Sequence, residues 1–275
     1  MRYTADHAFH IGSQHLRGGL PCQDYALSKS APDHAIGVIS DGCSSGGETD
    51  VGARVIARST FQALTLTVPR YFATFTVDDR CEILDDLAQS ALGLEQSDML
   101  ATCGYVAATD RSLVVRLIGD GVIAAKSDRE LIMTRFDWAK NMPVYRAYAD
   151  DKYAGFIAAH GGEFVDAMTV TRHIRRDGVV TEKVIPQPLY DFLRGLSDSI
   201  SPRNYEFVAV FSDGVTQIDG MDWRDVVAQL MSFKSAEGAF VKRRMLRFLK
   251  DCQAHGKGPI DDISMACIHI DHEAE

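Results

Sequence analysis

The order of strand-like and helix-like runs is the feature that most constrains this fold. Apolar, β-branched runs predict strands over 3–11, 34–40, 101–109, 112–118, 121–126, 130–136, 205–212 and 262–270. Helical periodicity predicts one helix over 49–67 and others that begin near 78, 188, 221 and 237. The helices come in pairs between runs of strands, not one after each strand. This order favours an α+β fold with antiparallel sheets and outer helices over a regular βαβ alternation.

The domain organisation follows from the length of the chain and from its lack of repeats and linkers. The 275 residues show no repeat, no low-complexity stretch and no linker rich in Pro, Gly or Ser, so we expect a single domain over 1–275. Residues 137–204 have the least regular pattern and contain a predicted hairpin turn at Asp177-Gly178. We interpret 137–204 as an insertion or a lid over the core.

Composition excludes several classes of partner. The formal net charge of −9 argues against nucleic acid, whose phosphates attract basic surfaces. The N-terminus lacks the pattern of a secretory signal, and no apolar run approaches the roughly 18 residues that span a bilayer. The six cysteines form no CxxC pair and are expected to be reduced thiols, mostly packed in the core. We therefore expect a cytoplasmic protein with no membrane partner.

Acidic residues follow several of the predicted strands. Three of the five Asp-Gly pairs end apolar runs, in AIGVIS-DG, LVVRLIG-DG and FVAVFS-DG, and Asp261 and Asp262 precede the last strand. Acids at the ends of neighbouring strands converge, and two carboxylates a few ångströms apart do not both stay ionised without a cation. Mg²⁺ and Mn²⁺ prefer oxygen ligands, and two such ions about 3.5–4 Å apart form the usual clamp for in-line attack on phosphate.

An Asp-Gly pair is also the commonest short turn signal, and this alternative applies to each pair. Asp177-Gly178 and Asp219-Gly220 are interpreted as turns. Asp120-Gly121, taken alone, fits a hairpin turn as well as it fits a metal site. Asp41 and Asp213 differ, because each follows a serine and a buried run and precedes a helix-like segment.

The motifs, taken in order, resemble the metal-dependent protein phosphatases, the PPM or type 2C family. They are CQDYA (22–26), SDGCSSGG (40–47), ATCGYVAA (101–108), IGDGVIA (118–124), FSDGVTQ (211–217) and DDISM (261–265). The opening GSQHLRGGLPCQD is most similar to compact bacterial members. The resemblance implies two stacked antiparallel β-sheets flanked by pairs of helices, an α-β-β-α sandwich, which agrees with the element order above.

The resemblance also implies a role for individual positions. It implies that Asp41 bridges two metals, that the Gly42 carbonyl binds the second, that Asp213 and Asp261 bind the first, that Asp24 holds metal-bound waters, and that Asp120 forms a third, weaker site with Asp213. Asp262 stands where the family usually has Asn. An acid there would either tighten metal binding or face solvent.

The chain departs from the family pattern at three points. Gln23 stands beside Asp24 where the family has Glu or Asn. The phosphate-binding Arg is not at its usual offset, so His15 and Arg17 are the candidates for the substrate phosphate, and Arg has the better geometry for bidentate contact. Cys43 occupies the position where some members carry a His proposed as general acid. A thiol is a poor acid for an alkoxide, so His15 or a metal-bound water is expected to supply the proton.

The function implied is Mg²⁺- or Mn²⁺-dependent hydrolysis of phosphoserine and phosphothreonine in proteins, by a metal-bridging hydroxide. The partners implied are a phosphorylated protein and an opposing Ser/Thr kinase, as in signalling. Two alternatives stay open at this point: a phosphatase-like regulatory or binding module without strong turnover, and a small-molecule phosphoesterase. The basic run over 240–250 is expected to pack an apolar face on a sheet and to leave its basic face in water.

Overall fold

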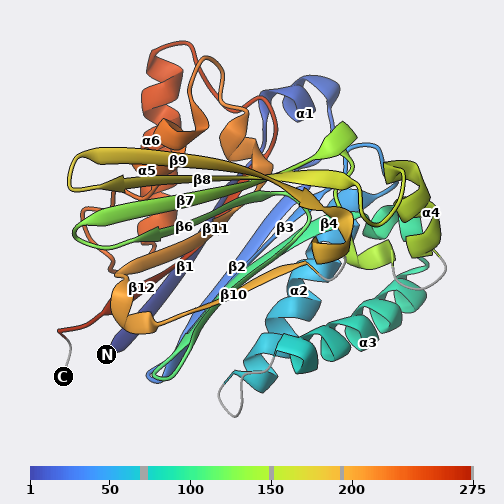
Figure 1. Cartoon of the computed structure of the whole chain (residues 1–275), viewed down its shortest axis with the longest axis horizontal. Coiled ribbons are helices and arrows are strands. Elements are labelled where there is room, and N and C mark those ends of the chain that lie inside the picture. The colour runs from blue at the N-terminus through green and yellow to red at the C-terminus, as the bar shows by residue number, and fades with distance from the viewer. Residues whose placement is uncertain (69–73, 149–151, 193–194, 274–275) are drawn as a thin grey trace.

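Two antiparallel sheets form the centre of the protein (Figure 1). The computed structural model describes residues 1–68, 74–148, 152–192 and 195–273. One sheet has seven strands, in the spatial order β1 (Arg2–His10), β12 (Ile263–Asp271), β11 (Phe207–Phe211), β6 (Gly121–Lys126), β7 (Glu130–Trp138), β8 (Asp166–Arg176) and β9 (Val179–Pro188). The other has five, in the order β10 (Leu196–Ile200), β5 (Leu113–Ile118), β4 (Ala101–Thr109), β3 (His34–Gly42) and β2 (Asp24–Ser30).

Helices cover the outer face of each sheet. The pair α2 (Thr49–Thr67) and α3 (Thr74–Leu92) lies beside the five-stranded sheet, and α5 (Trp223–Leu230) and α6 (Phe240–Ala254) lie beside the seven-stranded sheet (Figure 1). Two further helices lie in connections, α1 (Ser13–Gly18) and α4 (Lys152–His160). Short 3₁₀ turns complete the described elements: η1 (Gln96–Met99), η2 (Ala139–Asn141), η3 (Arg146–Tyr148), η4 (Leu189–Phe192), η5 (Pro202–Asn204) and η6 (Asp213–Thr216). Within the described ranges, none of the helices is both long enough and apolar enough to cross a membrane.

Alternation along the strands builds the hydrophobic core in layers. On β11, Val210 packs between the two sheets whereas Phe211 packs against α5 and α6. On β3, Ile39 packs between the sheets whereas Ile36 faces α2 and α3. Successive side chains of a strand point to opposite faces, so central strands that are apolar on both faces require cover on both sides. The α+β sandwich predicted from the sequence is therefore confirmed.

Helix α6 bears out the expectation for the basic run. Phe240, Met245 and Phe248 are buried against the seven-stranded sheet, whereas Lys242 and Arg243 are exposed.

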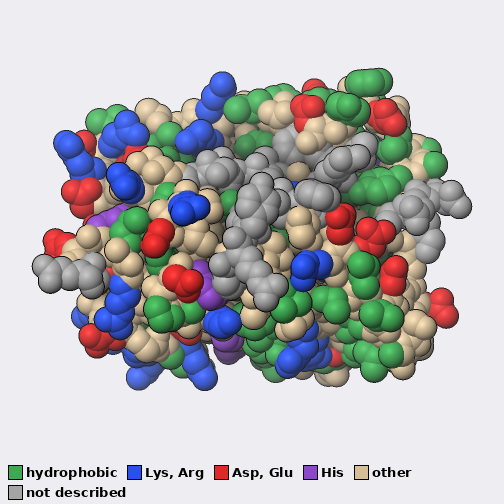
Figure 2. Space-filling model, turned by 90° about the horizontal axis from the view of Figure 1, so that it is seen from below, with side chains coloured by type: hydrophobic (Ala, Val, Ile, Leu, Met, Phe, Trp, Pro, Cys, Tyr) green, Lys and Arg blue, Asp and Glu red, His purple; other side chains and the backbone are tan. Residues whose placement is uncertain are grey.

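Four of the six cysteines are buried, as expected for core packing. On the face drawn in Figure 2, Lys and Arg side chains lie among Asp and Glu side chains, so the negative charge does not form one continuous acidic surface there.

The predicted helix from 188 is wrong. Residues Leu189–Phe192 form only a 3₁₀ turn, and Leu196–Ile200 is a strand that pairs with β5. Long-range pairing overrides the local apolar periodicity here, since the buried strand β5 would otherwise be left with an unpaired edge. The sequence patterns also fail to predict the strands β2, β8, β9 and β10.

One of the Asp-Gly pairs closes a hairpin turn, as predicted, and another does not. Asp177 and Gly178 join β8 to β9 in a hairpin, with φ of 48° and 80°, as predicted. Asp120-Gly121 does not close a hairpin, because β5 and β6 belong to different sheets and the chain crosses between the sheets at this point. Within 137–204, β8 and β9 extend the seven-stranded sheet and β10 extends the five-stranded sheet. That this region is an insertion or lid, and that 1–275 is one domain, stay predictions.

Candidate functional site

Two acids meet where β2 and β3 pair. Asp24 and Asp41 are register partners on these neighbouring antiparallel strands, so their side chains leave the sheet side by side. Asp24 is fully buried, and its Oδ1 has no hydrogen-bond partner among the described residues. A buried carboxyl oxygen without a partner is costly, so this atom indicates a missing ligand.

The seven-stranded sheet contributes its own acids at the same place. Strand β11 ends at Phe211 and is followed by Ser212 and Asp213, while Asp261 precedes β12. The Ser212 hydroxyl donates to Asp24 Oδ2 at 2.7 Å and accepts from the Ser264 amide at 2.8 Å. This fully buried serine therefore links β12 of one sheet to Asp24 of the other.

Glycine permits the close approach of these segments. A Cβ on Gly214 would lie 1.8 Å from the Asp262 carbonyl oxygen, so a larger residue would separate η6 from the chain that carries Asp261. The side-chain amide of Gln217, three residues further on, donates to Asp213 Oδ2 at 3.0 Å and to Asp261 Oδ2 at 3.2 Å. These two carboxylates thus share one donor.

Asp120 joins the group from the crossing between the sheets. Thr102, the register partner of Asp41, donates from its hydroxyl to Asp120 Oδ1 at 2.9 Å. Gly121 has a φ of 135°, and a Cβ there would lie 2.4 Å from the Phe211 carbonyl. The glycine lets the chain pass close to the end of β11.

The carboxyl groups interact electrostatically. Burial, followed by repulsion from Asp24, Asp213 and Asp120, raises the pKa of Asp41 well above its usual value. Burial, followed by Asp120 and Asp261, does the same to the pKa of Asp213. Burial also raises the pKa of Asp24 to about 7, against the opposing effect of its hydrogen bonds. A group of acids that disfavours its own ionisation in this way fits divalent cations, which relieve the repulsion and take oxygen ligands.

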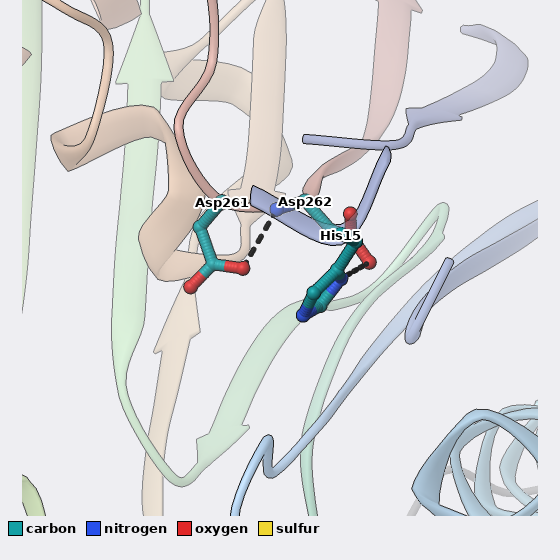
Figure 3. A group of neighbouring side chains, drawn as sticks. All are labelled: His15, Asp261 and Asp262. Carbon is teal, nitrogen blue, oxygen red and sulfur yellow. Dashed lines mark hydrogen bonds and ion pairs between the residues drawn. The ribbon is translucent and has the colours of Figure 1, made fainter. Parts of the chain in front are cut away.

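His15 lies at the edge of this group, on α1 (Figure 3). Its Nδ1 lies 2.8 Å from Asp262 Oδ2, and both side chains are buried. One potential ligand atom from each of His15, Asp261 and Asp262 lies within 4.8 Å of the other two. In Figure 3 the Asp262 carboxylate is directed at His15, while the Asp261 carboxylate lies apart from it.

Asp262 does not face solvent, which corrects one of the two expectations for it. Its side chain is buried. Its Oδ1 accepts from the backbone N–H of Gly12 at 2.6 Å, and its Oδ2 accepts from the backbone N–H of Gln23 at 2.6 Å. Together with His15, these donors use both carboxylate oxygens. The acid at this position therefore holds α1 and the start of β2 together.

Two other predicted residues lie outside the acidic group. Arg17 is exposed, and its guanidinium donates to the Ser13 carbonyl at 3.1 Å and to the Ser13 hydroxyl at 3.2 Å. Gln23 links the loop after β3 to α2, accepting from Ser44 at 3.1 Å and donating to Thr49 at 2.8 Å.

An open cavity of about 360 Å³ adjoins the acids, and it is lined by Asp120, Arg135, Asp137, Asn141, Asp213 and Gln217. Sequence reasoning missed Ser212, Gln217 and Arg135. The first two lie inside the quoted motif FSDGVTQ, whereas no local signal distinguishes Arg135 from other strand residues.

Comparison with known proteins identifies the family. The family model described as Protein phosphatase 2C matches residues 11–250. The chain belongs to the protein phosphatase 2C family. Membership confirms the resemblance and makes the chain a protein phosphatase enzyme. No curated protein sequence matches this chain significantly.

Solved phosphatases share the fold of this family member. A bacterial serine phosphatase bearing a point mutation aligns with a TM-score of 0.60 at 11% identity, covering 98% of this chain and 99% of that chain. Serine/threonine phosphatase Stp1 from Staphylococcus aureus aligns at 0.56 and 11% identity, covering 97% and 94%. The S. agalactiae serine/threonine phosphatase aligns at 0.56 and 14% identity, covering 98% and 100%.

Proposed function

We propose that this chain hydrolyses phosphoserine and phosphothreonine in proteins with the aid of two divalent cations, Mg²⁺ or Mn²⁺. The observation that carries the proposal is that Asp24 and Asp41 of one sheet interact electrostatically with Asp213 of the other, while Oδ1 of Asp24 has no hydrogen-bond partner among the described residues. When bound, such cations supply an activated water and neutralise charge on the phosphate.

The proposed roles of the acids are those that the family resemblance implies, and the contacts of the acids support them. Asp41 is the proposed bridging ligand, with Asp213 and Asp261, which share the Gln217 amide, as ligands of the first cation. The Gly42 carbonyl is the proposed ligand of the second. Asp120, adjoining the open cavity beside Asp213, is the proposed ligand of a third, weaker cation.

Asp24 and His15 are the proposed groups that orient water and substrate. Asp24 is held by the Ser212 hydroxyl at one oxygen, which leaves the other oxygen to position water. His15 is held by Asp262 through Nδ1, so Nε2 is the ring atom left to face the substrate phosphate, to which it donates only when Nε2 also carries a proton. Arg17 is the weaker candidate for this role, because its guanidinium donates to Ser13.

The proposed partners are a phosphorylated protein and a Ser/Thr kinase that opposes the enzyme in cytoplasmic signalling. The family supports a phosphoprotein substrate. The cavity beside Asp213 is lined by both Arg135 and Asp137. Because it offers both charges, it suits the polar residues that flank the phosphorylated side chain in a peptide.

The direct test is turnover of a phosphoserine peptide by the purified chain with Mn²⁺. We expect Asp41→Asn and Asp213→Asn to lose at least about 100-fold in kcat/KM, because each removes a proposed cation ligand. Asp177→Asn is the matched control, since Asp177 also precedes a glycine but lies in the β8–β9 turn. Activity that persists in EDTA would contradict the metal mechanism.

The same assay separates the alternative functions. Two departures from the family pattern motivate a test for a regulatory or binding module. The phosphate-binding Arg is not at its usual offset, and Cys43 stands where some members carry a His. Mn²⁺ binding without turnover of any phosphopeptide would support that module. Turnover restricted to small phosphate esters would support a small-molecule phosphoesterase.

A further inference from the structure

A small cavity lies between helix α6 and the connection that leads to it from α5. Its volume is about 80 Å³, and half of the residues that line it are cations: Lys234, Arg243, Arg244 and Arg247. Together the cavity and these cations form what we call the basic pocket. No acid lines it, although the chain as a whole has a formal net charge of −9. Positive charge is therefore concentrated at one place on an acidic protein.

The cations of the basic pocket are not neutralised within the part of the chain that the structure describes. The Arg243 guanidinium donates to the Glu237 carbonyl at 2.7 Å, and Arg244 Nε donates to the Gln229 carbonyl at 2.6 Å. Both acceptors are backbone oxygens. Among the described residues, no carboxylate forms an ion pair with any of the four cations. Their charges are therefore available to an anion from outside the chain.

The cations also affect one another. Burial lowers the pKa of Arg244, Asp251 raises it, and Arg247 lowers it again. Like charges held in one place disfavour their own ionisation, and a bound anion relieves this cost. A carboxylate suits the basic pocket because a guanidinium presents a planar fork of donors that matches its two oxygens.

Aromatic rings form the apolar side of the basic pocket. Phe233 and Phe240 line it with their ring centroids 5.0 Å apart, and the Phe233 ring also lies 4.9 Å from that of Phe207. Phe207 begins β11, whereas the acids of the candidate site follow the other end of this strand, beyond Phe211. The basic pocket thus lies at the opposite end of the strand from the acidic group.

We propose that the basic pocket binds an acidic segment of a partner protein. Carboxylates of the segment accept hydrogen bonds from the guanidinium groups, and an apolar side chain beside them packs on Phe233. Clusters of Arg recognise acidic motifs in this way. A membrane or a nucleic acid fits less well, because each presents an extended anionic surface to a protein of net charge −9. The inference goes beyond the proposed phosphatase function and does not rest on it.

The test is the binding of a labelled peptide that carries Glu residues on both sides of one Leu, measured by fluorescence anisotropy at low ionic strength. We expect the double variant Arg243→Glu, Arg247→Glu to bind at least about 10-fold more weakly than wild type, because each change replaces attraction with repulsion. The same peptide with Gln in place of Glu should lose a similar factor on wild type.

The matched control is the double variant Arg80→Glu, Arg111→Glu. These arginines are exposed on α3 and in the β4–β5 turn, so the control changes the net charge equally but away from the basic pocket. It should bind the Glu peptide as wild type does. Thermal denaturation shows whether each variant is folded. If reversal on α6 unfolds the protein, Lys234→Glu, in the exposed connection, is the second variant and should weaken binding about threefold.

Several outcomes would overturn the inference. Equal weakening by the two double variants would indicate general charge attraction, and a wild type that does not bind the Glu peptide would exclude the site. Tighter binding of phosphatidylserine vesicles or of single-stranded DNA through Arg243 and Arg247 would assign the basic pocket to a different partner. A wild type that binds the peptide but turns over no phosphate ester would remove the proposed function and leave this inference intact.

Discussion

At the scale of single residues, the acids differ in how far sequence predicts them. Asp41 and Asp213 each follow a serine at the end of an apolar run, and this repeated setting marks them as a pair. The role of Asp262 is not predictable in the same way. It depends on which backbone amides of Gly12 and Gln23 reach each carboxylate oxygen from the other end of the chain.

Asp262→Asn tests the role of that carboxylate. The oxygen of the new Asn side chain can still accept from the backbone N–H of Gly12. Its NH₂ group then faces the backbone N–H of Gln23, so the buried hydrogen bond from Gln23 is lost. We expect the free energy of unfolding to fall by about 1–3 kcal/mol, measured by urea denaturation. The Nδ1 atom of His15, which donates to the carboxylate, should instead accept from the new amide group, and ¹⁵N NMR of the ring measures this change.

The control is the His–Asp pair at the start of β3, in which His34 is buried but the acid is exposed. Asp33 lies 2.7 Å from His34 Nδ1 but is 65% exposed, so Asp33→Asn should leave the free energy of unfolding nearly unchanged. Equal effects from the two substitutions would contradict a structural role for Asp262.

At the scale of elements, prediction succeeds where a run is long and periodic. Helix α2 matches its predicted range of 49–67, and β4 and β6 match theirs. The strand β2 is not apparent because DYALSKS lacks a β-branched residue and buries only two of its side chains. The helix predicted from 188 fails because pairing with β5 decides the structure of 196–200.

The connection after β7 provides an element-scale prediction. Arg146→Met leaves the buried Asp85 carboxylate without its cation, and burial already raises the pKa of Asp85. We expect the free energy of unfolding to fall by about 3 kcal/mol in urea denaturation. Adding Asp85→Asn should recover part of the loss.

Arg54→Met is the matched control on α2. Arg54 pairs with Asp50 at 2.8 Å, but its side chain is 39% exposed and the pair is solvated. Its loss should therefore have a much smaller effect. A similar loss in the two variants would contradict the view that the buried Arg146–Asp85 pair holds η3 against α2 and α3.

At the scale of the whole molecule, the acidic site connects pH to stability. In the metal-free protein the pKa of Asp24 is raised from 3.8 to about 7. A raised folded-state pKa contributes stability that is fully present below the unfolded value, near pH 4, and is lost as pH rises through about 7. Cations that bind only the folded state oppose this loss.

We therefore expect the Tm of the EDTA-treated protein to fall between pH 6 and pH 8. The increase in Tm produced by Mn²⁺ should be larger at pH 8 than at pH 6. Thermal denaturation of wild type and Asp24→Asn measures both effects, and the substitution should reduce the fall in the metal-free profile, to which Asp41 and Asp213 also contribute. Identical pH profiles for the two proteins would show that Asp24 is not the group responsible.

The position of β12 has a consequence for the order of events during synthesis. This strand lies between β1 and β11, although it is formed by residues 263–271. Asp261 directly precedes it. A growing chain that has not reached this point lacks both the hydrogen-bonding neighbour of its first strand and one acid of the site. Completion of the seven-stranded sheet and completion of the acidic site are therefore one event, and both wait until the ribosome has released β12.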